Sequence, residues 1–129
     1  MSKKEGETFF DHYTFYDGPD SEGSKGYINY VDKQNAHDLK IANVTWENVD
    51  GDQSDGEKEP FVYMNTAATA DGPRHSIRLE GLRRFNRGLF IIDLRHMPAG
   101  CASWPAFWMS DVSKESFYFV FRQLRLLIT

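Results

Sequence analysis

The sequence contains a single cysteine, and its charges of opposite sign are nearly balanced. Cys101 has no partner within the chain, which excludes an intramolecular disulfide and a zinc site built from cysteines. With 15 Lys and Arg against 19 Asp and Glu, the formal net charge of -4 gives no support for nucleic acid or an anionic membrane as a partner. The histidines lack the spacing of metal ligands, so we expect neither a metal site nor a cofactor; they are His12, His37, His75 and His96.

Long hydrophobic runs are also missing. No apolar run approaches the roughly 18 residues of a membrane-spanning helix. Residues 1–20 contain no apolar stretch of signal-peptide length. Read literally, the sequence predicts a soluble chain that is not exported, and it leaves the compartment open.

Aromatic and turn-forming residues, in contrast, are plentiful. Ten Phe, six Tyr and three Trp make up 15% of the chain, and Gly and Pro add 15 positions. Aromatic residues suit a pleated, half-buried surface, and Gly and Pro suit turns. The composition therefore favours an all-β fold, and 129 residues make one domain the natural expectation.

Short strand-like segments recur at spacings near ten residues, which is typical of a sandwich or barrel. The expected strands are 9–16, 27–31, 61–64, 76–79, 88–94 and 104–109. Asp32 is expected to cap a helical turn over residues 33–39. Residues 47–60 are mostly acidic, Gly, Asn and Ser, so we expect a solvated loop. A calcium loop requires Gly at its sixth position and Glu at its twelfth, but counted from Asp50 these positions hold Asp55 and Phe61.

Residues 104–109, with the sequence WPAFWM, carry the strongest local signal. In a strand, Trp104, Ala106 and Trp108 would share one face, and the small alanine would leave an open space between two flat rings. Phe107 and Met109 would then point to the opposite face and pack into the core. Sugar rings can stack on such a surface, while Asn29, Arg74 or Asp93 would serve their hydroxyls. The alternative is that both tryptophans fill the core. A strip of arginines over residues 74–87 could bind an anion instead, although strand alternation would divide its side chains between two faces.

Four segments resemble the N-terminal half of fungal glycoside hydrolase family 16 proteins, the laminarinase-like endo-1,3(4)-β-glucanases. They read GYINYVD (26–32), GPRHSIRL (72–79), GLFIIDLRHMP (88–98) and CASWPAFWM (101–109). The resemblance covers about residues 9–110 and implies an antiparallel, concanavalin A-like β-jelly-roll sandwich, here incomplete, with a glucan-binding cleft on its concave sheet. It also implies β-glucan as partner and a family that is typically secreted. Within it, Trp104, Trp108, Asn29 and Arg74 are the candidate substrate contacts.

The family's catalytic motif is not found. Its retaining mechanism uses two carboxylates about 5 to 5.5 Å apart, on one strand of the type Glu-x-Asp-x-x-Glu that should follow Trp108 and Met109. After Met109 the only glutamate is Glu115, so no catalytic residue can be assigned. Residues 112–114 can be encoded by GTGAGTAAA, which resembles a fungal 5′ splice junction, and residues 126–129 by a sequence containing CTAATC, which resembles a branch point. We therefore expect residues 111–129 to be a non-family tail, read from an unspliced intron; a diverged C-terminus with a strand over residues 117–121 is the alternative.

Three classes of function follow from the resemblance. The first is a family 16 β-glucanase acting on internal β-1,3 or β-1,3/1,4 bonds, inactive as the chain stands. The second is a non-catalytic glucan-binding remnant, and the third is a truncated product without a ligand. Half of a jelly roll would leave strand edges unpaired, so self-association through those edges is also expected.

Overall fold

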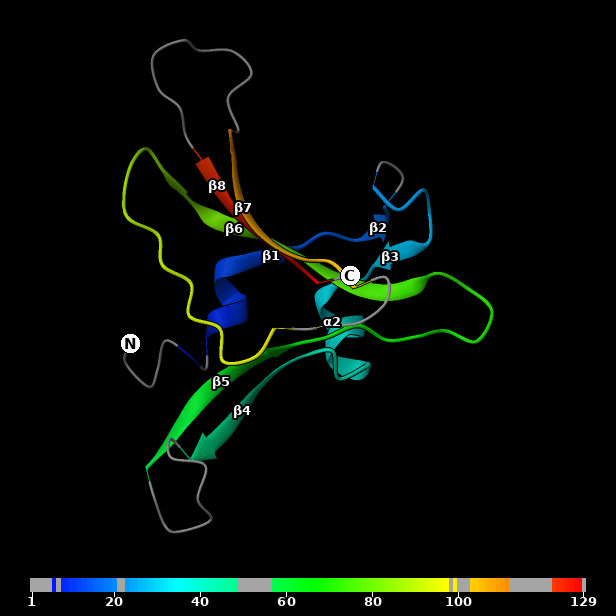
Figure 1. The fold of residues 1–129 in the computed structure, drawn as a ribbon, viewed down its shortest axis with the longest axis horizontal. Coiled ribbons are helices and arrows are strands. Elements are labelled where there is room, and N and C mark those ends of the chain that lie inside the picture. The colour runs from blue at the N-terminus through cyan, green and yellow to red at the C-terminus, as the bar shows by residue number, and fades with distance from the viewer. Residues whose placement is uncertain are drawn as a thin grey trace.

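A computed structural model describes residues 6, 8–20, 23–48, 57–97, 99, 103–111 and 122–128, which form an all-β fold (Figure 1). A six-stranded sheet has the order β2-β3-β6-β8-β7, with β1 paired to β6, and β4 and β5 form a second, two-stranded sheet. The strands are β1 (Tyr13–Phe15), β2 (Gly18–Pro19), β3 (Ile28–Tyr30), β4 (Ala42–Asn48), β5 (Lys58–Met64), β6 (Arg74–Phe85), β7 (Pro105–Asp111) and β8 (Arg122–Ile128). The prediction of an all-β chain is confirmed.

The strand pairs are antiparallel with one exception, because β3 pairs with β6 in parallel. Parallel neighbours need a long connection that brings the chain back to its starting end. Here α2 (Lys33–Asp38) and the β4–β5 hairpin provide that connection. The expectation of purely antiparallel pairing is therefore wrong at this pair.

The hydrophobic core lies between the two sheets, where Figure 1 shows the helical elements. Ile77 and Leu79 of β6 are fully buried there. They meet residues from the β4–β5 hairpin and from the helical elements; the other buried members are Phe10, Val31, Ala36, Ile41 and Ala42. Burial of these side chains supplies the main stabilisation of the fold.

Two short helical elements flank this core. Residues 9–12, predicted as part of a strand, instead form the 3-10 helix η1 (Phe9–His12), which buries Phe10. In the second, α2, the Asp32 side chain accepts a 2.8 Å hydrogen bond from the backbone N–H of Asn35. The predicted cap is confirmed. In the described part of the chain no helix is long and apolar enough to cross a membrane.

Three findings depart from the predicted strands. Residues 88–94 are not in a strand, and their apolar side chains are exposed, Leu89 by 85% and Ile91 by 80%. The strand next to β6 is instead β8, which pairs antiparallel with β6 on one side and with β7 on the other. Strand β4 was not predicted either, and the alternative strand over residues 117–121 lies outside the described residues.

Candidate functional site

Strand β6 divides its side chains between two faces of the sheet. Ile77 and Leu79 point into the core. Arg78 and Glu80 alternate with them along the strand and therefore lie on the opposite face. Alternation extends this second face to Arg74 and Ser76. We call it the polar face.

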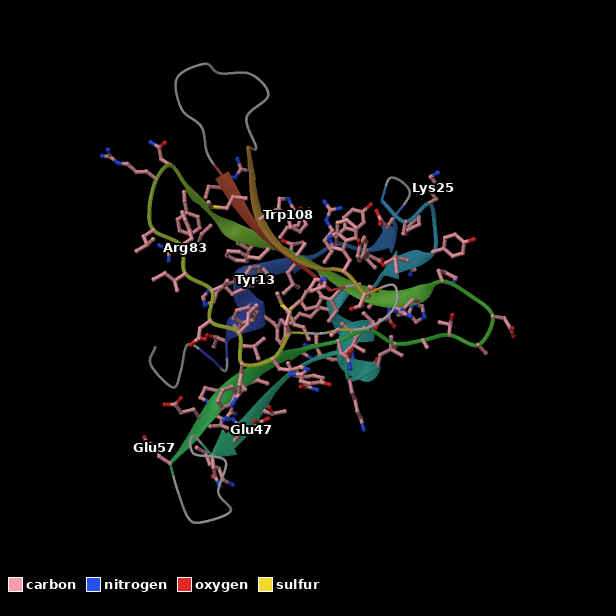
Figure 2. All side chains as sticks on the ribbon, in the orientation of Figure 1. Tyr13, Lys25, Glu47, Glu57, Arg83 and Trp108 are labelled. Atoms are coloured by element: carbon pink, nitrogen blue, oxygen red, sulfur yellow. The ribbon has the colours of Figure 1, made fainter. Side chains whose placement is uncertain are left out.

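Strand β7 follows the same division through its shared partner β8. Trp108 and Glu80 both pair with Arg125, so Trp108 lies on the polar face. Phe107 and Leu79 both pair with Leu126, so Phe107 lies on the core face. The prediction that Trp108 and Phe107 point to opposite faces is confirmed, and Figure 2 shows Trp108 beside the β6–β8–β7 part of the sheet.

The predicted burial of Phe107 in the core is wrong. Its side chain is 36% exposed and is not part of the core cluster. The physical reason is that α2, η1 and the β4–β5 hairpin bury the part of the sheet around Ile77 and Leu79, and β7 lies two strands away from it. Trp104 directly precedes β7 and is 72% exposed, so this residue does not fill the core.

Asn29 does not join Arg74 and Trp108. The parallel register pairs Ile28 with Arg74 and Asn29 with His75. Partners in a ladder share a face, so Asn29 lies on the core face. Its side-chain amide donates a 3.4 Å hydrogen bond to the Tyr30 carbonyl. The sequence-based grouping of Asn29 with Arg74 is thus corrected by the register.

Arg78 is the centre of a compact polar cluster on the polar face. Its Nη2 atom lies 2.9 Å from Oε1 of Glu80, and both side chains are about three-quarters buried. The guanidinium carbon also lies 4.7 Å from the ring centroid of Tyr16. A partly buried ion pair and a cation–π contact together hold the Arg78 plane in one orientation.

Tyr30 supports this cluster from β3. Its ring packs edge-on against Tyr16 with centroids 5.8 Å apart, and only 2% of the residue is exposed. Burial raises the pKa of Tyr30 to about 12, and the negative charge of Asp20 adds to the effect. Asp20 in turn accepts hydrogen bonds from the backbone N–H groups of Gly23 (3.2 Å) and Ser24 (2.8 Å), which fixes the loop before β3.

A family model and several known proteins match most of this chain. A model of XgeA-like, catalytic GH16 domains matches residues 13–116, which include β1 to β7 and the whole polar face of β6. The chain belongs to glycoside hydrolase family 16. No solved structure matches it.

Several fungal proteins are similar over about four-fifths of the chain. A probable endo-1,3(4)-beta-glucanase of Aspergillus flavus is 35% identical over 106 residues, which are 81% of this chain and 14% of that protein. The endo-1,3(4)-beta-glucanase xgeA of Emericella nidulans is 32% identical over 81% of this chain and 15% of its own length. A probable glycosidase of Schizosaccharomyces pombe is 33% identical over 84% of this chain and 23% of its own length. The chain thus spans between about a seventh and a quarter of these relatives.

The arginine strip of this family 16 chain does not form one anion site. Arg78 is paired with Glu80. Arg83 lies within the register shift of β6 and Arg84 at its end, and both residues are exposed. Arg87 lies farther along, in the exposed bend after β6.

Sequence reasoning missed the partnership of Tyr16, Tyr30 and Glu80 with Arg78. One signal was readable, since polar residues at 74, 76, 78 and 80 alternate with Ile77 and Leu79. The contact of Tyr16 depends on the pairing of β1 with β6, and that of Tyr30 on the pairing of β3 with β6; no local pattern specifies either pairing.

The catalytic and metal candidates of the sequence are not brought together in the described residues. Glu115 and the acidic residues Asp50, Asp52 and Asp55 lie outside the described residues. Within the described ranges no group of three His, Cys, Asp or Glu side chains could hold a metal ion. The polar face therefore offers aromatic rings, guanidinium donors and one paired carboxylate, a set suited to binding neutral hydroxylated rings.

Proposed function

We propose that this family 16 chain binds β-1,3 or mixed β-1,3/1,4 glucan on its polar face. Trp108 and Trp104 serve as platforms for sugar rings, and Arg74 donates hydrogen bonds to hydroxyls. The relatives whose names include endo-1,3(4)-beta-glucanase support this class of polysaccharide. The observation that carries the proposal is the register, which puts Trp108, Arg74 and the Arg78–Glu80 pair on one face of one sheet.

The affinity of this face is expected to be low. Each stacked ring contributes roughly 1 kcal/mol, whereas association costs about 4 kcal/mol or more in lost freedom. Hydrogen bonds from Arg74 and its neighbours supply the remainder. The dissociation constant for a laminari-oligosaccharide should therefore be on the order of 1 mM or weaker.

Electrophoresis in native gels containing laminarin tests the binding. The chain should be retarded in proportion to the laminarin concentration, and Trp108→Ala and Arg74→Ala should each lose most of the retardation. Trp46→Ala is the matched control, because Trp46 lies in β4 of the other sheet and is 42% exposed. Retardation that is lost in Trp46→Ala and kept in Trp108→Ala would contradict the proposed face.

We propose further that the 129-residue chain binds without hydrolysing. It contains no Glu-x-Asp-x-x-Glu segment, and retaining hydrolysis needs a nucleophile and an acid/base carboxylate. Purified chain should release no reducing sugar from laminarin or lichenan over the blank. Endo-hydrolysis that disappears in Glu115→Gln would refute this, because Glu115 is the only glutamate after Met109.

Residues 111–129 are proposed to be read from an unspliced intron. Sequencing the transcript across the codon for residue 111 tests this, and the expected result is a spliced form that continues from Met109 into a Glu-x-Asp-x-x-Glu segment. The formation of β8 by residues 122–128 favours the second candidate, in which the tail is a working part of a glucan-binding protein. A transcript population that encodes only the present tail would support that candidate.

A further inference from the structure

Strand β8 pairs with β6 at the position where the sequence predicts that residues 89–94 would pair. Phe85 ends β6, Asn86 and Arg87 form a bend, and an apolar run begins at Leu89. Two apolar segments joined by so short a bend are the pattern of an antiparallel hairpin. The other edge of β6 is held by β1 at Leu79–Gly81, so the hairpin partner would enter on the edge that β8 now holds.

The displaced residues lie outside the sheet with their apolar side chains exposed. We call Gly88–Met97 the outer segment; none of its residues is in a strand. Its exposed fractions are high for apolar side chains: Leu89 85%, Ile91 80%, Ile92 37%, Leu94 48% and Met97 54%. Exposure of contiguous apolar side chains is unfavourable, and pairing in a sheet would relieve it.

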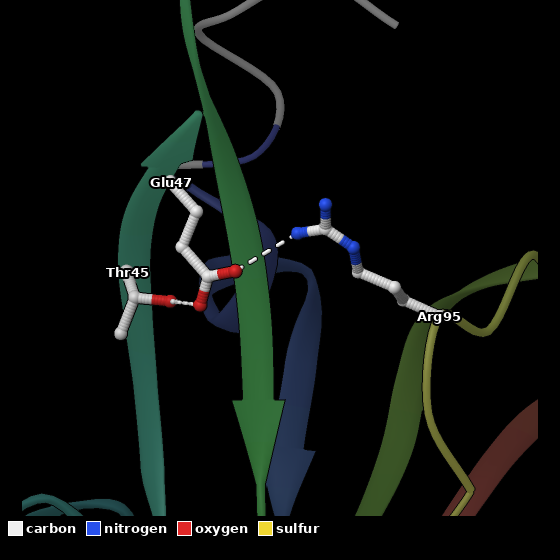
Figure 3. A network of polar contacts seen from close by, with 3 residues as sticks. All are labelled: Thr45, Glu47 and Arg95. Carbon is white, nitrogen blue, oxygen red and sulfur yellow. Dashed lines mark hydrogen bonds and ion pairs between the residues drawn. The ribbon is translucent and has the colours of Figure 1, made fainter. Parts of the chain in front are cut away.

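The outer segment is held away from the sheet by a contact with the β4–β5 hairpin (Figure 3). Nη1 of Arg95 lies 2.8 Å from Oε2 of Glu47, and Thr45 donates a 3.3 Å hydrogen bond to the same carboxylate. The Arg95 guanidinium also lies 4.3 Å from the ring centroid of Phe61. At its other end, Phe90 packs edge-on against Phe85 and lines a cavity of about 250 Å³ together with Met109.

The family match separates the two competitors. Residues 13–116 match the family, and this range includes the outer segment and excludes β8. We propose that β8 and residues 89–94 compete for the same position between β6 and β7, and that β8 acts as a substitute strand which displaces the strand predicted for residues 89–94. The contact of Arg95 with Glu47 and Phe61 stabilises the displaced state. The inference needs no bound glucan, and its tests measure strand pairing alone.

Hydrogen exchange on the full chain tests the competition. Leu126→Pro removes a backbone donor from β8, which a central strand does not tolerate. Amides of residues 89–94 should then exchange at least about tenfold more slowly, because they enter the sheet. Adding Ile91→Pro to this variant should abolish the gain. If residues 89–94 exchange in Leu126→Pro as fast as in the unaltered chain, the competition is refuted.

Disulfide trapping gives a second test that leaves β8 able to pair. In a Cys101→Ser background, Arg84→Cys with Gln123→Cys should oxidise readily, because these residues are direct partners. Arg84→Cys with Ser110→Cys is the control and should not, because β8 lies between their strands. Absence of a cross-link in the first pair, or its presence in the second, would overturn the placement of β8.

The rate of that cross-link also reports on the Arg95 contact. Adding Arg95→Ala should slow oxidation of the Arg84→Cys, Gln123→Cys variant several-fold, because the outer segment is freed to occupy the position. Lys58→Ala removes a positive charge from the same hairpin without touching Glu47 or Phe61 and should leave the rate unchanged. Equal rates with and without Arg95→Ala would show that the contact does not control the competition.

Discussion

Tyr30 shows how single residues shape the polar face. Its ring is buried between the sheet and Tyr16, and its hydroxyl lies near the carboxylate of Asp20. A neutral phenol is tolerated in this position, whereas a phenolate would be both desolvated and repelled. Tyr30 therefore stabilises the fold only while it stays protonated, and it fixes the Tyr16 ring that Arg78 contacts.

The raised pKa of Tyr30 predicts a loss of stability at high pH. Its ordinary pKa is 10.0 and its folded value is about 12, so the contribution is complete below pH 10 and is lost as the pH rises to about 12. The loss amounts to up to about 3 kcal/mol for a shift of this size. Urea unfolding at pH 9 and at pH 11.5 should show it.

Tyr30→Phe is the test variant for this pH dependence, and Tyr27→Phe is its control. Tyr30→Phe should flatten the pH dependence of the free energy of unfolding in this window. Tyr27→Phe, at a residue that is 79% exposed, should keep it. An unchanged pH dependence in Tyr30→Phe would show that another group causes the loss.

At the scale of elements, the sequence predicted the helix and the strands that are determined by local patterns. The Asp32 cap specified α2, and apolar or aromatic alternation specified β3, β5, β6 and β7. Strand β4 was missed although Ala42, Val44 and Trp46 alternate with polar residues as a half-buried strand requires. The helix η1 was missed because burial of Phe10 outweighs the strand preference of its aromatic residues. Residues 88–94 have strand chemistry but lose their position to β8, a competition that no local pattern reveals.

Strand β6 should show the division of faces in its stability. Leu79→Ala opens a cavity in the core and should lower the free energy of unfolding by about 2–5 kcal/mol. Leu82→Ala, on the same strand but 61% exposed, should change it by less than about 0.5 kcal/mol. Chemical denaturation measures both. Similar losses in the two variants would mean that the core does not lie where Ile77 and Leu79 place it.

At the scale of the whole molecule, the two sheets have different tasks. The β4–β5 hairpin and the helical elements cover the core face of the larger sheet, and the opposite, polar face is the proposed glucan-binding surface. The role of Trp104 and Trp108 as sugar platforms stays a prediction. The parallel pairing of β3 with β6 separates Asn29 from Arg74, since a shift of one residue exchanges the faces. Self-association through strand edges stays a prediction.

The indole N–H signals of the three tryptophans test the glucan-binding face most directly. Three such signals are expected in a nitrogen–proton correlation spectrum, and Trp46 on the other sheet is an internal control. Titration with laminarihexaose should shift the signals of Trp104 and Trp108 along a saturation curve with a midpoint on the order of 1 mM, while Trp46 stays in place. A shift confined to Trp46, or no shift of Trp108 at saturating sugar, would contradict the account.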